Sequence, residues 1–442
     1  MPILLAVLLS WLLGPVSEAH AVPSFARQTG QACTVCHTTF PELTPYGRLF
    51  KLQGYVLSGG GPWIPPVAGM AQAALTHTDR AQPGGVAPGF GSNDELTLQE
   101  ASLFYAGKIA WKIGAFVQGT YDGVADHWAI DNTDVRFADT VSLGGKSLTF
   151  GVTLNNNPTV QDVWNTTPAW RFPYQTSSVA PAPAAATMLE GGFAQQVAGL
   201  GAYVFWNNLL YVEVTPYRSL SRDTQRSFGI NTDGENTIRG FAPYWRIALD
   251  HNRGRHSASI GTYGMVANTF PGQERGAGTD RLTDLAVDGQ YQYLGAEHVV
   301  TLQASWIHEN QSRPASQALG VSANRSDTLQ SLTAAASYLY DRTYRLTLSY
   351  FDIHGGRDTG LYQPGSVGGS RTGSPDSDGF IFQLDYLPFN KKPLPFYPWL
   401  NVKFSVQYIL YDRFNGAHHD YDGSGRDASN NNTLNIFAWA AF

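Results

Sequence analysis

Apolar and polar residues alternate with a period of two along most of this chain, from about residue 67 to the end. In the segment 343–350, tyrosine and leucine occupy the even positions, and threonine, arginine and serine the odd ones. The segment 401–408 does the same, with Val402 and Phe404 opposite Lys403 and Ser405. Successive side chains of a strand point to opposite faces, so the pattern predicts strands with one apolar and one polar face.

Sixteen such strands are predicted, separated by turn-forming residues. Their ranges are 67–78, 96–108, 109–121, 133–141, 146–154, 194–206, 209–217, 240–250, 256–267, 282–294, 297–309, 327–340, 343–354, 378–388, 398–412 and 432–442.

The predicted connections alternate between short and long. Short ones include 207–208, 251–255, 295–296 and 341–342. Outer-membrane barrels have an even number of strands, short periplasmic turns and long extracellular loops. A soluble sandwich alternates too, but has no reason to sort its loops. We therefore predict an all-β fold, a 16-stranded transmembrane antiparallel β-barrel over 67–442, with both ends on the periplasmic side. The long loops are 79–95, 122–132, 155–193, 218–239, 268–281, 310–326, 355–377 and 413–431.

Composition and the last residue agree with this fold. Charged residues make up 14% of the chain and aromatic residues 13%, and there are 46 glycines. Phe442 ends the last predicted strand on its apolar face, which is similar to the sorting signal of outer-membrane barrels. The alternative is a soluble strand that ends in phenylalanine. The net charge of −6 gives no indication of nucleic-acid binding.

The polar face of the strands would line a lumen of mixed charge with several bulky aromatics. We expect it to be partly filled, although sixteen strands are enough for an aqueous channel. The residues assigned to the lumen are Glu100, Lys112, Arg345, Asp385, Lys403, Phe104, Phe116, Phe437 and Trp439.

The first residues form an apolar run of signal-peptide length, followed by Ala19-His20-Ala21, a typical cleavage site. No lysine or arginine precedes the run. An uncleaved anchor is the alternative, but the run is shorter than the ~20 residues of a membrane-spanning helix. We predict a signal peptide at 1–21 and export from the cytoplasm.

The two cysteines of the chain, Cys33 and Cys36, lie three positions apart and precede His37. C-x-x-C-H is the attachment motif of c-type haem, in which the two thiols bond to haem vinyl groups and the histidine is the proximal iron ligand. The alternative is a redox-active thiol pair. We predict one covalent haem c.

The predicted cytochrome segment, 22–66, has only 45 residues and is too short to bury a haem alone. We expect part of the pocket to come from the mouth or lumen of the barrel. Thr44 followed by Pro45 predicts the start of a helix. Arg27, Arg48 and Lys51 could pair with the haem propionates, or form a solvated basic face.

No motif identifies the distal haem ligand. Met70 is the first candidate, because its position in the strand points it into the lumen near the periplasmic end. Met265 also faces inward but nearer the outside, and Met188 falls in the longest loop. His77 has the parity of the lipid face. Another histidine or an open iron site remains an alternative.

The string Phe25-Ala-Arg-Gln-Thr-Gly30 before Cys33–His37, with Gly47-Arg-Leu-Phe-Lys51 and Gly54-Tyr55 after it, resembles the outer-membrane fused monohaem cytochrome–porins. The resemblance covers about 35 residues. It implies a monohaem segment before a sixteen-stranded barrel, with Cys33 and Cys36 holding the haem. The best-known members of that family oxidise extracellular ferrous iron.

Three functions follow as hypotheses. The first is an outer-membrane electron conduit, an oxidoreductase that passes electrons from extracellular Fe(II), through one haem c, to a periplasmic c-type cytochrome. The second is a porin for small solutes in which the haem segment is a plug. The third is the same conduit run outward, reducing extracellular acceptors. A monomer is expected in each case.

A transient iron site would need hard oxygen ligands and imidazole. Two predicted outer loops contain them, although a solvated polar loop is the simpler interpretation of each. The loop 155–170, with Trp164 and Trp170, is expected either to fold inward as a constriction or to form a surface lid. The candidate iron ligands are Asp122, Asp126, His127 and Asp131 in one loop and His418, His419, Asp420 and Asp422 in the other.

Overall fold

The computed structural model describes residues 23–60, 64–391 and 399–442. The predicted signal peptide lies outside the described residues. Three short helices, α2 (Pro23–Thr29), α3 (Cys33–Cys36) and α4 (Pro45–Leu52), precede the first strand. Among the described residues, no helix is long and apolar enough to cross a membrane.

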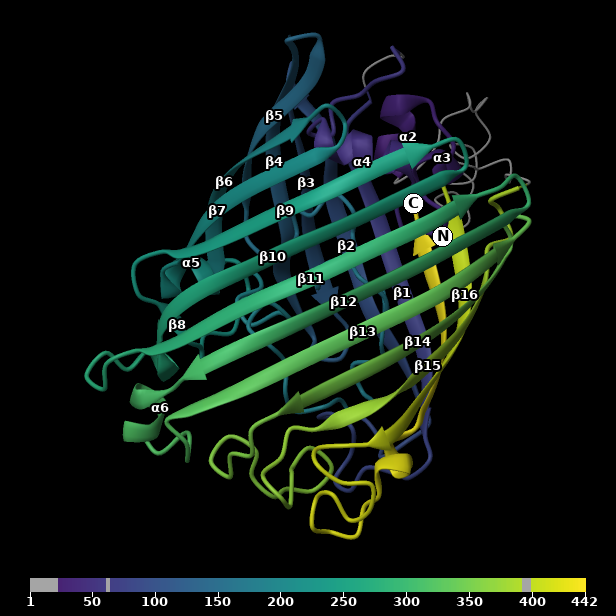
Figure 1. Ribbon diagram of the computed structural model, residues 1–442. Coiled ribbons are helices and arrows are strands. Elements are labelled where there is room, and N and C mark those ends of the chain that lie inside the picture. The colour runs from purple at the N-terminus through teal and green to yellow at the C-terminus, as the bar shows by residue number, and fades with distance from the viewer. Residues whose placement is uncertain (1–22, 61–63, 392–398) are drawn as a thin grey trace, which may run out of the picture.

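One antiparallel sheet of seventeen strands makes up the rest of the described chain (Figure 1). One of them, β8 (Thr237–Ile238), is a two-residue strand in a loop, so sixteen long strands remain. They are β1 (Val67–Thr78), β2 (Glu95–Ala110), β3 (Ile113–Asp122), β4 (His127–Leu143), β5 (Lys146–Asn155), β6 (Val197–Trp206), β7 (Leu210–Ser219), β9 (Ala242–Arg253), β10 (His256–Phe270), β11 (Asp280–Leu294), β12 (His298–Ser312), β13 (Ser326–Tyr340), β14 (Tyr344–Gly355), β15 (Ser377–Tyr386), β16 (Asn401–Arg413) and β17 (Thr433–Ala441).

Each long strand pairs with its neighbours in sequence, and β1 pairs with β17 to close the sheet. The closing register runs from Met70 opposite Ala441 to Thr78 opposite Thr433. Closure leaves no sheet edge unpaired. The predicted sixteen-stranded antiparallel barrel is therefore confirmed, and all sixteen predicted strands are present.

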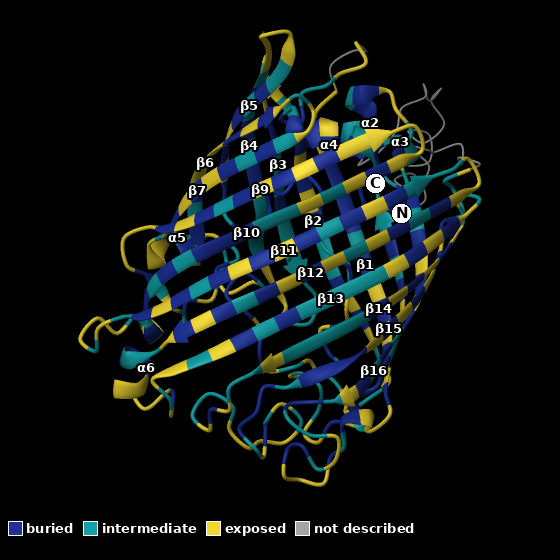
Figure 2. Cartoon of the chain, viewed as in Figure 1, coloured by how far each residue is buried: buried dark blue, intermediate teal, exposed yellow. Residues whose placement is uncertain are grey.

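The two faces of the wall differ as the alternation predicted (Figure 2). In β14, Tyr344, Leu346 and Leu348 are exposed on the outside, whereas the intervening Arg345 and Thr347 are buried. Phe442 is exposed at the end of the chain. The outer wall is apolar and the lumen is polar and filled.

Two connections differ in length from the prediction. The turn 123–126 between β3 and β4 is short, because residues from His127 onward pair with β3. Polar residues such as Asp131 suggested a loop, although a polar residue that faces a lumen belongs equally well in a strand. The connection 387–400 is long, and its sequence is rich in proline, which cannot donate to a strand ladder.

The lumen side chains lie mostly where alternation put them, with one exception. Lys112 is not on a strand face: it sits in the turn between β2 and β3, with its Nζ 2.5 Å from Asp139 Oδ2 and 4.1 Å from the Trp111 ring centroid. The turn begins after Ala110, so the parity of a continuous strand does not apply there.

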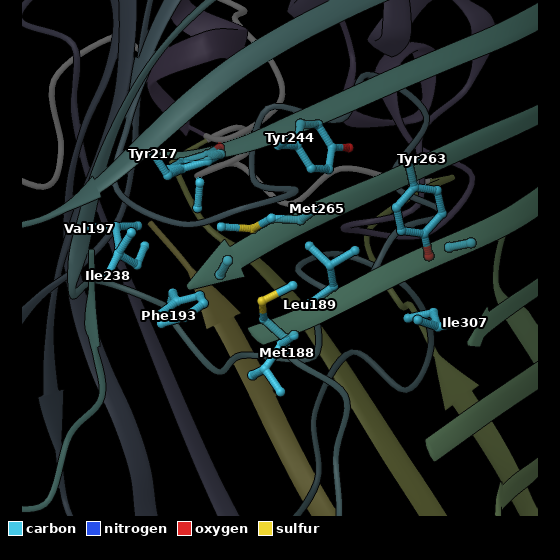
Figure 3. Packing of buried hydrophobic residues seen from close by; sticks show 14 residues of the cluster. Met188, Leu189, Phe193, Val197, Tyr217, Ile238, Tyr244, Tyr263, Met265 and Ile307 are labelled. Carbon is cyan, nitrogen blue, oxygen red and sulfur yellow. The ribbon is translucent and has the colours of Figure 1, made fainter. Parts of the chain in front are cut away.

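The long connection 156–196 between β5 and β6 folds into the lumen. Of the two expectations for its first part, an inward constriction or a surface lid, the structure has the inward fold. Trp164 packs edge-on against Tyr211 of β7 and donates from Nε1 to Asp250 of β9 at 2.9 Å. Met188 and Leu189 pack against Met265 of β10 (Figure 3). The loop therefore contacts inward residues of several strands and occupies much of the interior.

A buried arginine ties this loop to the wall. Arg246 of β9 places its Nε 3.3 Å from Asp162 of the loop and its Nη2 2.7 Å from Asp288 of β11. All three side chains are nearly inaccessible to solvent. A cation shared between two buried carboxylates holds the loop in place, since either carboxylate alone would be costly to bury.

We expect Arg246→Leu to destabilise the barrel by about 3–5 kcal/mol, because it leaves two buried carboxylates without a cation. Arg253→Leu, on the exposed end of the same strand, is the matched control and should change stability little. Thermal unfolding followed by circular dichroism in detergent measures both. Equal melting temperatures for the two variants would contradict this account of the loop.

Candidate functional site

The C-x-x-C-H motif forms a tight turn at the end of the barrel where the C-terminus lies (Figure 1). Helix α3 spans the two cysteines, and the backbone N–H of His37 donates to Cys33 O at 2.9 Å. One helical turn places positions i and i+3 on the same side, so both cysteines face the same way. Gly47 of α4 lies so close that a Cβ there would be 2.2 Å from Cys36 O.

Helix α4 begins as the sequence predicted. Thr44 is its N-cap and accepts a hydrogen bond from Gly47 N at 3.3 Å, with Pro45 at the first position. The hydroxyl of Thr44 also donates to Val35 O. This double contact fixes α4 against the turn that carries the motif.

Cys33, Cys36 and His37 line a cavity of about 330 Å³ inside the barrel. Met70 of β1 lines the same cavity. A volume of this size is typical of small-molecule sites. Aromatic rings supply much of the remaining wall, from the N-terminal segment, from the strands and from the inward loop: Phe25, Phe40, Phe50, Phe104, Phe116, Trp170, Tyr174 and Trp439.

His37 keeps part of its surface in the cavity, while its Nδ1 is buried and makes no hydrogen bond within normal distance. Burial lowers the pKa of His37 to about 4, and the nearby backbone carbonyls of Glu42 and Pro41 offset this only in part. The imidazole is therefore neutral at physiological pH, the form that ligates metals.

The donor set fits a haem c. It combines two thiols at the required spacing, a neutral imidazole beside them and a thioether that lines the same cavity. The aromatic lining suits an apolar macrocycle. The buried Nδ1 of His37 without a partner would leave the other ring nitrogen for a metal.

The three basic residues of the N-terminal segment lie in different places. Arg27 does not line the cavity: it donates to Val67 O and stacks over Trp399 at 4.3 Å, and burial lowers its pKa to about 10. Arg48 is also outside the cavity lining, and its Nη1 donates to Gln290 of β11 at 2.8 Å.

Lys51 is the basic residue of the segment that lines the cavity. Its Nζ donates to Val160 O at 2.9 Å and to Asn165 Oδ1 at 3.1 Å. Burial, followed by the nearby Arg136, lowers the pKa of Lys51 to about 7. Arg171 of the inward loop is a second cation on the lining, and sequence reasoning missed it because nothing in the sequence brings that loop to the motif.

The other candidates for a distal ligand do not line the cavity. His77 is exposed, and its Nδ1 lies 2.6 Å from Asp94 Oδ1. Met188 and Met265 are buried together in a separate cluster deeper in the lumen (Figure 3). Met70 is thus the methionine that shares the cavity with His37.

The two loops proposed for iron do not assemble as pre-formed sites. Asp126 is exposed and accepts from Tyr121 at 2.5 Å, whereas Asp131 lines the cavity. Asp420 and Asp422 accept hydrogen bonds from backbone N–H groups of their own loop. No group of three or more histidine, cysteine, aspartate and glutamate side chains among the described residues could hold a metal ion.

A buried ion pair docks the N-terminal segment on the barrel. Arg345 Nη2 of β14 donates to Glu42 Oε2 at 2.5 Å, and Glu42 also accepts from Thr301 of β12 at 2.7 Å. Tyr174 of the inward loop donates to Glu42 at 3.1 Å. Sequence parity put Arg345 in the lumen, but its partner Glu42 carried no signal.

No family model matches the chain, and no curated protein sequence matches it. Solved bacterial barrels are similar over 85% of its length. They include the outer membrane channel DcaP of Acinetobacter baumannii, with 13% identity, 96% of its chain covered and a TM-score of 0.47. The anion-selective porin of Comamonas acidovorans has 12% identity, 98% coverage and a TM-score of 0.46. OmpF of Salmonella typhi, in complex with daunomycin, has 14% identity, 97% of its chain covered and a TM-score of 0.45.

We expect Glu42→Gln to loosen the N-terminal segment, because it leaves the buried Arg345 charge uncompensated. The change should appear as faster cleavage of residues 23–60 by trypsin in detergent, measured by mass spectrometry. Glu297→Gln, in an exposed turn, removes the same charge without touching the segment and is the control. Identical cleavage rates would show that the pair does not dock the segment.

Proposed function

We propose that this protein is an outer-membrane electron conduit of the fused monohaem cytochrome–porin type. One observation carries the proposal: Cys33, Cys36 and His37 line a cavity inside the barrel, together with Met70 of its first strand. A C-x-x-C-H motif that shares its cavity with a barrel strand belongs to the barrel, and not to a separate carrier domain.

Membrane insertion is supported by the outer surface. Tyr344 and Tyr386 stack at 5.4 Å near the end with the C-terminus, and Tyr350 and Phe380 pair at 5.3 Å further along the same two strands. Six strand residues rise about 20 Å. Strands of such barrels are tilted by about 35–45°, so the two pairs and the leucines between them cover about 15 Å of the height of the wall, within the ~25 Å apolar band of an outer-membrane barrel.

A covalent haem c would supply a reversible one-electron centre in the cavity. Cys33 and Cys36 would hold it, and His37 would be the proximal ligand. Met70 is our candidate for the distal ligand. Lys51 and Arg171 are the cations on the cavity lining, so they are better placed than Arg27 or Arg48 to balance acidic groups of a bound cofactor.

The reaction is a one-electron transfer across the membrane. Extracellular Fe(II) loses one electron and becomes Fe(III), and an oxidised periplasmic cytochrome gains that electron. The product Fe(III), which hydrolyses readily, stays outside the cell. The opposite direction, outward reduction of an acceptor, uses the same residues and is a distinct outcome of the test below.

Free passage of solutes is not favoured by the interior. The loop 156–196 and the N-terminal segment contact inward side chains of β4, β7, β9, β11 and β14. A sixteen-stranded barrel with an empty lumen would conduct solutes. Here we expect sugar-driven liposome swelling well below that of an open porin.

The conduit is tested in liposomes that enclose oxidised cytochrome c and carry the protein in one orientation. External Fe(II) should reduce the enclosed cytochrome, monitored by absorbance. The Cys33→Ala/Cys36→Ala variant should fall to the rate of protein-free liposomes. Reduction at that background rate by the wild-type protein would overturn the proposal, and activity only with a reduced interior would establish outward flow.

The Met70 assignment is tested by spectroscopy of the purified haem-loaded protein. Replacing Met70 with Ala should abolish the near-infrared band of methionine–iron charge transfer and lower the reduction potential, since methionine ligation raises it. Met265→Ala, a buried methionine outside the cavity, is the matched control. An unchanged spectrum in the Met70 variant would exclude it as the ligand.

A further inference from the structure

Several buried carboxylates of the lumen are paired with arginine. This pattern is expected, because an isolated carboxylate is costly to bury. The pairs are Asp134 with Arg136 at 2.7 Å, Asp288 with Arg246 at 2.7 Å, Glu42 with Arg345 at 2.5 Å, and Glu190 with Arg171.

Glu100 of β2 and Asp131 of β4 have no arginine partner among the described residues, and neither do Glu213, Asp284, Glu309 and Asp385, which do not line the cavity. Glu100 and Asp131 both line the cavity, and neither forms an ion pair with a described residue. Glu100 accepts from Gln72 Nε2 at 3.1 Å. Asp131 accepts from Thr120 at 3.0 Å and from Gln195 at 2.9 Å. Each carboxyl group therefore has neutral hydrogen-bond partners only, and both face one cavity.

Gln72 provides an independent observation at the same place. It lines the cavity and is only 3% exposed, and its Oε1 has no hydrogen-bond donor. Its Nε2 is directed at Glu100 and lies 3.9 Å from Met70 Sδ. Gln72 is opposite Glu100 in the β1–β2 pairing, so one side chain carries both a donor to the carboxylate and a buried amide oxygen without a donor.

We propose that Glu100, Asp131 and Gln72 form a divalent-cation site on the wall of the cavity. Carboxylate and amide oxygens are hard ligands, which suit small divalent cations that keep part of their water shell. Two carboxylates match the charge of such a cation. The bound cation would in turn offset the cost of placing two carboxylates on one cavity.

The occupant is the electron donor itself, Fe(II), and this identification rests on the proposed function. The site adjoins Met70, so a bound Fe(II) would be held next to the redox centre of the cavity. Glu100 is opposite Asp122 in the β2–β3 pairing, so a further carboxylate lies beside it in the neighbouring strand.

Cation binding is tested without electron transfer, using Mn(II) and the purified haem-loaded protein in detergent. Electron paramagnetic resonance measures bound Mn(II). Glu100→Gln/Asp131→Asn should weaken binding at least about tenfold, because both charged ligands are lost. Asp223→Asn/Glu297→Gln removes two exposed carboxylates and should leave the affinity unchanged.

Gln72→Leu is the second variant, for the case that the double variant does not fold. It keeps both charges and removes the amide oxygen, and should weaken Mn(II) binding about threefold or more. Mn(II) binding that is unchanged in a folded Glu100→Gln/Asp131→Asn or Gln72→Leu protein would overturn the site.

Kinetics separate this site from the conduit. The double variant should raise KM for Fe(II) about tenfold, while reduction of the protein by ascorbate, an anionic donor, stays within twofold of wild type. If Fe(II) reduces no enclosed cytochrome but Mn(II) binding still depends on Glu100 and Asp131, the conduit fails and the cation site stands. If the conduit works and KM is unchanged, the site is wrong.

Discussion

The size of the N-terminal segment is the constraint on which the structure depends. A segment of about forty residues cannot enclose an apolar core of its own. The cavity beside its C-x-x-C-H motif is accordingly walled by the barrel, with Met70 from β1, Phe104 from β2 and Trp439 from β17. Because strands of the barrel form part of the cavity wall, the motif must lie inside the barrel. The lumen must also hold the segment in one position.

Charge pairing achieves that positioning. Arg345 holds Glu42 of the segment, and Arg246 holds Asp162 of the inward loop. These contacts fill a lumen that would otherwise contain water. Burying these ion pairs requires desolvation of the charges. It also favours a single position of the segment and the loop, since a charge buried without its partner is strongly destabilising. Glu100 and Asp131 have no arginine partner in the described part of the chain and line the cavity, and we assign them a cation from solution as partner.

Local periodicity explains how much could be predicted. The alternation in 343–350 placed Arg345 in the lumen, and the parity of β1 placed Met70 there, because the side-chain direction of a strand follows from sequence alone. Parity also directed His77 to the lipid face, where it is exposed. What periodicity cannot give is which residues meet across the lumen.

Partners across the lumen were accordingly missed. Arg48 was expected near the motif because it is near in sequence, but its helix directs it to Gln290 on the opposite wall. Arg171 and Tyr174 reach the cavity from a loop more than a hundred residues away in sequence. Asp131 was taken for a loop residue because a lumen-facing carboxylate and a solvated one look the same in sequence.

The seam of the barrel has a consequence for biogenesis. Met70 and Trp439 come from strands near the two ends of the chain, and β1 meets β17 only when the last strand has been made. The cavity therefore does not exist in a partly built barrel. The N-terminal segment can therefore make its final contacts with both end strands only after the seam has formed. Docking of the segment and closure of the wall are thus coupled by the topology.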